Sequence, residues 1–237
     1  MNKFLKAITS FDIEGLKWML EGNAAWLQWK EKDGKNALHY LCGVPVQHEK
    51  EKQGQSLSIL KFLVKKGMDI NAVHSIQDKD CSFPATPLWY AYTRGRNEKI
   101  YNWLLTQGAN PENCMYAIAW YDDTKAAALF HRHGAGIDPR NGKDSPFMAA
   151  FLWKKYSVAK WFLEHGADVN ARDQDGNSTL YYAVKRKFPP EKIQLLVEYN
   201  ADAHSKNNVG ITPYFLAKTK GPKKILELLD KYGSQPA

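Results

Sequence analysis

The chain has 237 residues, 44% hydrophobic and 24% charged, a composition typical of folded globular proteins rather than of disordered ones. Its 33 Lys and Arg against 25 Asp and Glu give a formal net charge of +8, a modest excess spread along the chain, so nucleic acid is not an expected partner. Three cysteines without a CxxC pair indicate neither a disulfide framework nor a zinc site. They fit a reducing, cytoplasmic location.

The N-terminal segment is predicted to form a helix pair from Lys3 to Glu21, with an apolar stripe that includes Phe4 and Leu16. Asp12 and Glu14 interrupt its apolar run, so a signal peptide is not expected. No window reaches about 18 consecutive apolar residues, which predicts no membrane span. Residues 1–32 are therefore expected to be an N-terminal capping pair.

Helix pairs are predicted next from Asn36 to Lys66 and from Thr86 to Gln107. The first of these pairs is interrupted at 43–54 by a charged insertion bounded by helix breakers. We expect a projecting loop there, because insertions between repeated helices map to loops on one face. A second insertion, at 73–83, is expected to lengthen the turn that precedes the next pair.

A degenerate fourth pair is predicted from Glu112 to His133. Three regular pairs follow, beginning at Ser145, Thr179 and Thr212. No linker or low-complexity segment divides the chain, so residues 1–237 are expected to form a single domain. Its C-terminal capping repeat is expected at 213–237.

Two markers recur in a fixed order along these segments. The first is a helix-ending phrase such as Gly166-Ala-Asp-Val-Asn170, and several of its copies lie about 33 residues apart. The second is a helix start resembling Thr-Pro-Leu, found at Asn36, Thr86, Ser145, Ser178 and Thr212. Two markers that alternate in the same order indicate an internal repeat.

On these markers the chain resembles the ankyrin-repeat family over nearly its whole length, with central repeats at 33–212. The resemblance implies an all-α ankyrin-repeat solenoid of about seven helix pairs with short β-turn projections. Ankyrin-repeat proteins that bacterial pathogens deliver into host cells are similar in their degenerate repeats and long insertions, which offers one biological setting.

Each marker has a physical role. Thr or Ser at the helix start accepts a hydrogen bond from an unpaired amide, and Pro87, Pro146 and Pro213 occupy a first turn that needs no amide donor. The glycines at the projecting turns supply a positive φ. His39 matches the histidine of the family's Thr-Pro-Leu-His motif, where it is expected to bond loop backbone.

Catalytic groups are not evident. His131 and His133 lie at a helix end without a nearby acidic or cysteine partner, so a capping pair is favoured over a metal site. Asp122 and Asp123 are more simply explained as the start of a helix than as a catalytic carboxylate pair. With no phosphate-binding loop and no hydrolase motif, we expect no enzymatic activity, no cofactor and no metal ion.

The resemblance implies a protein-interaction module whose groove is lined by turn tips and by the ends of the first helices. The residues predicted to end those helices are aromatic in the middle of the chain and basic on either side. They form the predicted partner-binding set: Arg94, Trp120, Tyr121, Leu152, Trp153, Lys185, Arg186 and Lys220. The expected partner is an acidic protein segment with large apolar anchors, bound by a monomer.

Other interpretations stay open. Trp120 or Trp153 could pack sideways and stabilise the stack without any partner. The remaining tryptophans considered, Trp18, Trp89, Trp103 and Trp161, are expected in the core. The alternatives to a binding module are a host-directed effector or regulatory scaffold, an anionic-surface or nucleic-acid binder, and an enzyme whose site is built by the two insertions.

Overall fold

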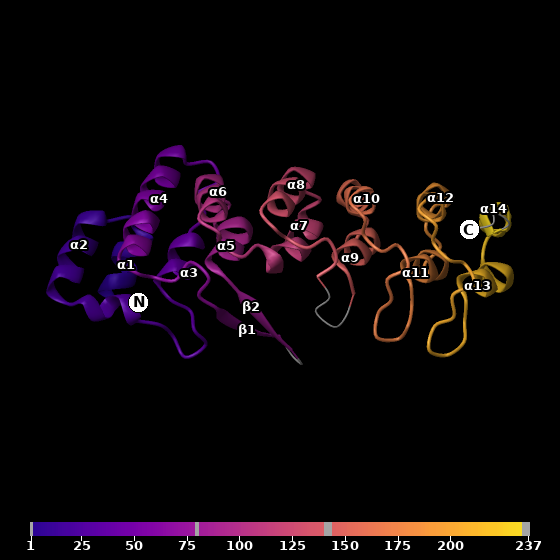
Figure 1. Cartoon of the computed structure of the whole chain (residues 1–237), viewed down its shortest axis with the longest axis horizontal. Coiled ribbons are helices and arrows are strands. Elements are labelled where there is room, and N and C mark those ends of the chain that lie inside the picture. The colour runs from indigo at the N-terminus through magenta and orange to yellow at the C-terminus, as the bar shows by residue number, and fades with distance from the viewer. Residues whose placement is uncertain (1, 79–80, 140–143, 234–237) are drawn as a thin grey trace. The chain divides into compact units, whose positions relative to one another are not determined.

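The computed structural model describes residues 2–78, 81–139 and 144–233. Within these ranges the chain is mainly helical and follows the expected succession of seven helix pairs (Figure 1). It divides into two compact units, Met1–Cys114 with Phe130–Ala135, and Met115–Leu129 with Gly136–Ala237. That residues 1–237 form one domain, capped at 1–32 and 213–237, stays a prediction.

The first unit holds three helix pairs and a β-hairpin. Its elements are α1 (Lys3–Thr9), α2 (Ile13–Gly22), the 3₁₀ helix η1 (Ala24–Gln28), α3 (Ala37–Cys42), α4 (Lys50–Lys65), β1 (His74–Asp78), β2 (Cys81–Ala85), α5 (Pro87–Tyr90), the π-helical turn η2 (Ala91–Gly95), α6 (Glu98–Thr106) and the 3₁₀ turn η3 (Glu112–Cys114). Phe130, near the end of α8, belongs to this unit and packs edge-on against Tyr92.

The second unit holds four pairs, apart from the end of α8, and the first of these pairs is the degenerate one. They are α7 (Met115–Tyr121) with α8 (Thr124–Arg132), α9 (Pro146–Leu152) with α10 (Tyr156–Glu164), α11 (Thr179–Lys185) with α12 (Pro190–Glu198), and α13 (Pro213–Lys220) with α14 (Lys223–Gly233). The helices α9, α11 and α13 form one row and α10, α12 and α14 another (Figure 1).

The predicted helix starts are confirmed. The side-chain oxygens of Thr86, Ser145, Ser178 and Thr212 each accept a hydrogen bond from the amide three residues later, at 3.0 to 3.3 Å. Asn36 caps α3 in the same way, and the side chain of His39 accepts a bond from the Asn36 amide in return. These side chains satisfy amides that a helix leaves unpaired at its first turn.

The predicted glycine positions are also confirmed in the repeat that contains the helix-ending phrase at Gly166. Gly166 ends α10 with φ of +89°, and Gly176 lies at the tip of the projecting turn with φ of +75°. A Cβ at Gly176 would also clash with Asn208 of the next projecting turn. A side chain at either position would therefore strain the backbone, and at Gly176 it would also separate two neighbouring turns.

The insertion predicted at 43–54 is only partly a loop. Helix α4 begins at Lys50, so the second half of the insertion extends the second helix of the pair. Gln53, buried in the first turn of that helix, donates hydrogen bonds to the carbonyls of Val46 and Gln47, each at 3.0 Å. These bonds hold the preceding loop against the first turn of α4. They explain why this polar, charged stretch begins a helix instead of continuing the loop.

The insertion predicted at 73–83 lengthens the turn as expected, and it does so as an antiparallel hairpin. Strands β1 and β2 pair His74 with Ala85 and Ile76 with Phe83. Apart from two isolated bridges, this two-stranded sheet contains all the strand structure in the described part of the chain. The hairpin is a local addition to a helical fold.

Buried side chains form the core of each unit, including Phe4, Leu38 and Ile59 in the first and Phe147, Phe162 and Leu180 in the second. The expectation that Trp18 is in the core is wrong, since 74% of its surface is exposed. Trp18 lies two residues from both Leu16 and Leu20, and a separation of two residues points to the opposite side of a helix. Of the other three tryptophans, Trp161 is buried, whereas Trp89 and Trp103 are partly exposed.

Candidate partner-binding site

Three aromatic side chains, Trp120, Tyr121 and Trp153, form an exposed group in the second unit that we call the aromatic cluster. Their exposed fractions are 54%, 38% and 41%, far above those of the core residues. The rings of Trp120 and Trp153 meet edge to face with centroids 5.1 Å apart. Contiguous exposed aromatic surface is uncommon on a protein that has no partner for it.

Local sequence positions this cluster at the ends of two neighbouring helices. Trp120 and Tyr121 are the last residues of α7, and Trp153 follows the last residue of α9. A left-handed residue follows the end of each helix, Asp122 with φ of +54° after α7 and Lys154 with φ of +63° after α9. Because α7 packs beside α9, two equivalent helix ends bring their aromatic residues together.

Two adjacent carboxylates support this region without forming a pair. The Asp123 carboxylate accepts a hydrogen bond of 2.9 Å from the Ala126 amide and so caps α8. The Asp122 carboxylate accepts one of 2.8 Å from the Val158 amide in the first turn of α10. The expected helix-start role is therefore confirmed for Asp123, whereas Asp122 caps a helix of the following pair.

One basic side chain lies beside the aromatic cluster, and three more belong to the same unit. The Lys155 ammonium lies 6.0 Å from the Trp120 ring centroid, and Lys154 beside it is exposed. Lys185 ends α11 and lies 5.4 Å from the ring centroid of Tyr181, while Arg186 follows it. We call Lys154, Lys155, Lys185 and Arg186 the basic rim, since they supply positive charge in the unit that carries the aromatic cluster.

The other predicted partner-binding residues also end first helices. Leu152 is the half-buried last residue of α9, and Lys220 is the exposed last residue of α13. Arg94 belongs to the first unit, where it lies in η2 with its guanidinium 6.0 Å from the Trp89 ring centroid. The predicted helix-end positions are thus confirmed, and the binding role of these residues stays a prediction.

His131, one of the two histidines of the possible metal pair, has a structural partner. The His131 ring bonds the carbonyl of Ala135 at 2.9 Å across the end of α8. Within the described ranges, no three His, Cys, Asp or Glu side chains gather in a group that could hold a metal ion. Cys42 and Cys114 are fully buried thiols whose pKa is raised by desolvation, which disfavours the nucleophilic thiolate.

His39 has the role that its motif implies. Its Nε2 lies 3.1 Å from the carbonyl oxygen of Ala72 and 3.2 Å from that of Ala85, on the two sides of the hairpin. Its Nδ1 accepts from the Asn36 amide, so the proton belongs on Nε2. Desolvation lowers the pKa of His39 to about 4, and the imidazole is neutral near pH 7.

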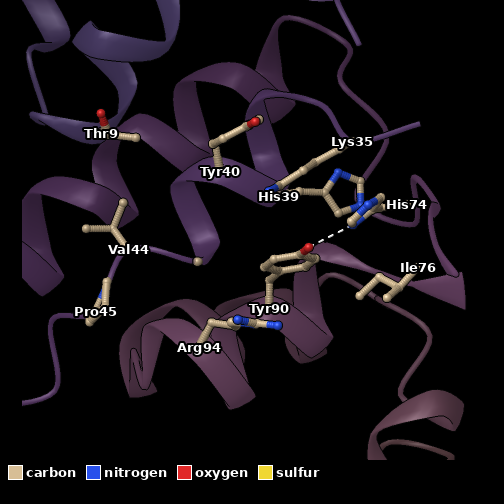
Figure 2. Close-up of a pocket in the computed structure, with 11 residues that line it drawn as sticks. Thr9, Lys35, His39, Tyr40, Val44, Pro45, His74, Ile76, Tyr90 and Arg94 are labelled. Carbon is tan, nitrogen blue, oxygen red and sulfur yellow. Dashed lines mark hydrogen bonds between the residues drawn. The ribbon is translucent and has the colours of Figure 1, made fainter. Parts of the chain in front are cut away.

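The structure adds a cavity that the sequence patterns did not reveal. This tyrosine pocket has a volume of about 500 Å³ in the first unit, and its walls include Lys35, Tyr40, His74, Tyr90 and Arg94 (Figure 2). One signal was available in the sequence, because Tyr40 and Tyr90 occupy the same position after the helix-start motif in consecutive repeats.

Three comparisons with known proteins agree on the repeat type. A family model described as ankyrin repeats in three copies matches residues 53–173 and 147–236. The chain is 29% identical over 219 residues to the nuclear factor NF-kappa-B p105 subunit of Gallus gallus. The alignment covers 87% of this chain and 21% of that protein. It therefore spans about a fifth of the length of this relative.

Solved ankyrin repeat domains have similar structures. The domain of Bcl-3 aligns with a TM-score of 0.73 at 20% identity, covering 97% of this chain and 98% of that one. The human ASB11 domain aligns with a TM-score of 0.68 at 20% identity over the whole of both chains. The expected all-α ankyrin-repeat fold is confirmed. In the described part of the chain, no helix combines the length and apolar character needed to cross a bilayer.

Proposed function

Since the chain belongs to the ankyrin-repeat family, we propose that it is a non-catalytic module that holds a partner protein on the aromatic cluster. Ankyrin repeats are protein–protein interaction modules, so the class of function follows from the fold. The observation that supports this site is the contiguous exposure of Trp120 and Trp153, whose rings are in contact. Large aromatic side chains at the centre of an interface supply much of its binding free energy.

The chemistry around the cluster favours an acidic partner with apolar anchors. Lys154, Lys155, Lys185 and Arg186 supply positive charge in the same unit. The two carboxylates that follow Tyr121 in the chain, on Asp122 and Asp123, accept bonds from helix amides. A partner segment would therefore place an apolar side chain on the tryptophans and its carboxylates towards the basic rim.

The remaining parts of this interpretation are also proposals. Leu152 and Lys220 are proposed to extend the contact along the second unit, and the predicted binding role of Arg94 concerns the first unit by itself. A monomeric, cytoplasmic protein stays our expectation. A steep fall of affinity with salt, unaffected by the tryptophans, would instead favour an anionic-surface or nucleic-acid binder.

Affinity capture from lysate with matched variants tests the site. The Trp120→Ala/Trp153→Ala variant should lose partner binding by about thirtyfold or more, because truncation of even one central residue of an interface costs about 2 kcal/mol. Its circular dichroism and urea midpoint should stay close to wild type, since both side chains are exposed.

Trp18→Ala is the control for this experiment. It removes an even more exposed tryptophan from the first unit, outside the aromatic cluster. This control should capture the same partner as wild type. Equal capture by the folded double variant would refute the assignment of the aromatic cluster.

A further inference from the structure

The tyrosine pocket is built around two tyrosines whose hydroxyl groups are already hydrogen-bonded. The Tyr90 hydroxyl lies 2.7 Å from Nδ1 of His74 (Figure 2). Nε2 of His74 lies 3.0 Å from the Asp33 carboxylate. The Tyr40 hydroxyl donates to the Glu31 carboxylate. With the hydroxyls bonded in this way, the rings serve mainly as apolar walls.

The wall opposite the tyrosines is the loop after α3, which a hydrogen bond holds close to η2. The Val46 amide donates a hydrogen bond of 3.0 Å to the carbonyl of Gly95, which ties the loop after α3 to η2. A Cβ at Gly95 would clash with the carbonyl of Cys42, so glycine permits this close approach. Val44 and Pro45, which precede Val46, therefore line the cavity in a constrained position.

Two cations face this cavity. The Lys35 ammonium lies 4.3 Å from the ring centroid of Tyr40 and 5.7 Å from that of Tyr90. Arg94 lies on the other side of Tyr90 in the view of Figure 2. Neither cation forms an ion pair with a carboxylate of the described residues.

Two carboxylates are bonded to the wall of the cavity, but neither belongs to its lining. Asp33 and Glu31 are not among its lining residues, and each already accepts a bond from a side chain of the pocket wall. The Lys35 amide, and after it His74, holds the pKa of Asp33 below its ordinary value, so that carboxylate stays charged and bonded to the wall. The two cations of the lining thus lie beside apolar and aromatic surface, whereas both carboxylates are outside the lining and bonded to the wall.

From this complementarity we infer that the tyrosine pocket binds an acidic side chain of an extended protein segment, with a neighbouring apolar side chain against Val44 and Pro45. Its volume of about 500 Å³ is larger than one side chain needs and lies within the range of ligand pockets. Lys35 would bind the carboxylate, and Arg94, on the other side of the Tyr90 ring, would add positive charge to the wall of the cavity. This inference does not rest on the aromatic cluster.

The test uses the immobilised full chain and two pools of short capped peptides that differ only in a central Glu or Gln. Wild type should retain the Glu pool about tenfold or more over the Gln pool, since a charge-assisted hydrogen bond contributes about 1.5 kcal/mol or more. The retained Glu peptides should be enriched in apolar residues beside the central position. Equal retention of the two pools would overturn the inference.

Matched variants locate the effect. Lys35→Gln/Arg94→Gln should abolish the preference for Glu, whereas Lys32→Gln/Lys65→Gln removes the same charge from exposed positions outside the pocket and should keep it. Trp120→Ala/Trp153→Ala should also keep it, so failure here and failure of the proposed function are distinguishable. A preference that survives Lys35→Gln/Arg94→Gln, or is lost with the tryptophans, would contradict the pocket assignment.

A competition experiment separates a protein segment from a free anion. Sodium phosphate should displace the Glu pool no better than sodium chloride of equal ionic strength. Specific displacement by phosphate would assign the cavity to a small inorganic anion and overturn the inference. Circular dichroism of each variant confirms that the fold is retained.

Discussion

Substitution of Asp122 tests whether one helix pair caps the next. Its carboxylate accepts a bond of 2.8 Å from the Val158 amide, in the first turn of α10. Lys155, at the N-cap position of α10, makes no side-chain cap bond of its own. The start of this helix should therefore depend on a residue that follows α7.

The magnitude of the effect follows from three contributions. Loss of a helix cap costs about 1 kcal/mol, and loss of negative charge beside a helix N-terminus costs about 0.3–1 kcal/mol. Asp122 also has φ of +54°, a conformation in which alanine is less stable by about 1 kcal/mol. We expect Asp122→Ala to lower the free energy of unfolding by about 2–3 kcal/mol, Asp122→Gly by about 1–2, and Asp122→Asn by about 0.5.

Urea unfolding of the three variants gives this order directly, and hydrogen exchange of the Val158 amide gives its location. Exchange at that amide should accelerate most in Asp122→Ala. Asp123→Ala is the control, because it removes the cap of α8 and should leave the exchange at Val158 unchanged. Equal losses in Asp122→Ala and Asp122→Asn, or an unchanged exchange rate at Val158, would refute the reasoning.

Three further predictions concern buried groups and backbone strain. Burial holds the pKa of His39 at about 4, below the unfolded value of about 6.5. The free energy of unfolding should therefore fall by about 3 kcal/mol as pH falls from 6.5 to 4. Urea titrations of His39→Gln should lack this pH dependence. Iodoacetamide should leave Cys42 and Cys114 unmodified in native buffer and label both in denaturing urea, as read by peptide mass spectrometry; native labelling would contradict their burial. Lys154→Gly and Lys187→Gly should each raise the free energy of unfolding by about 0.5–1 kcal/mol in urea titrations, because both residues have positive φ; a loss would show that their side chains matter more than the strain.

Features set by neighbouring residues could be predicted from the sequence. The cap at Ser178 and the turn at Gly176 depend on the chemistry of a few adjacent positions, and repetition of the same pattern fixed the order of the helix pairs. The same reasoning located Trp120 and Trp153 at helix ends. Their contact required only that the ends of neighbouring first helices lie together.

Features set by distant residues could not be predicted in this way. The start of α4 depends on bonds from Gln53 to carbonyls in the preceding loop, and composition alone favoured a loop. The tyrosine pocket depends on His74, which joins Asp33 to Tyr90 across 41 and 16 residues. The exposure of Trp18 was different, because its spacing from Leu16 and Leu20 already indicated the opposite face of the helix.

The hairpin has a consequence for how this protein could be altered by evolution or by design. His74 anchors its base to the two neighbouring repeats, and Ile76 contributes to the wall of the tyrosine pocket. Insertions or deletions between Ile76 and Phe83 would keep the bonds of His74 to Asp33 and Tyr90. They would also leave the helix pairs in place. The hairpin is thus a site where a foreign recognition loop could be grafted next to an existing pocket, so that new specificity could be gained without redesign of the repeats.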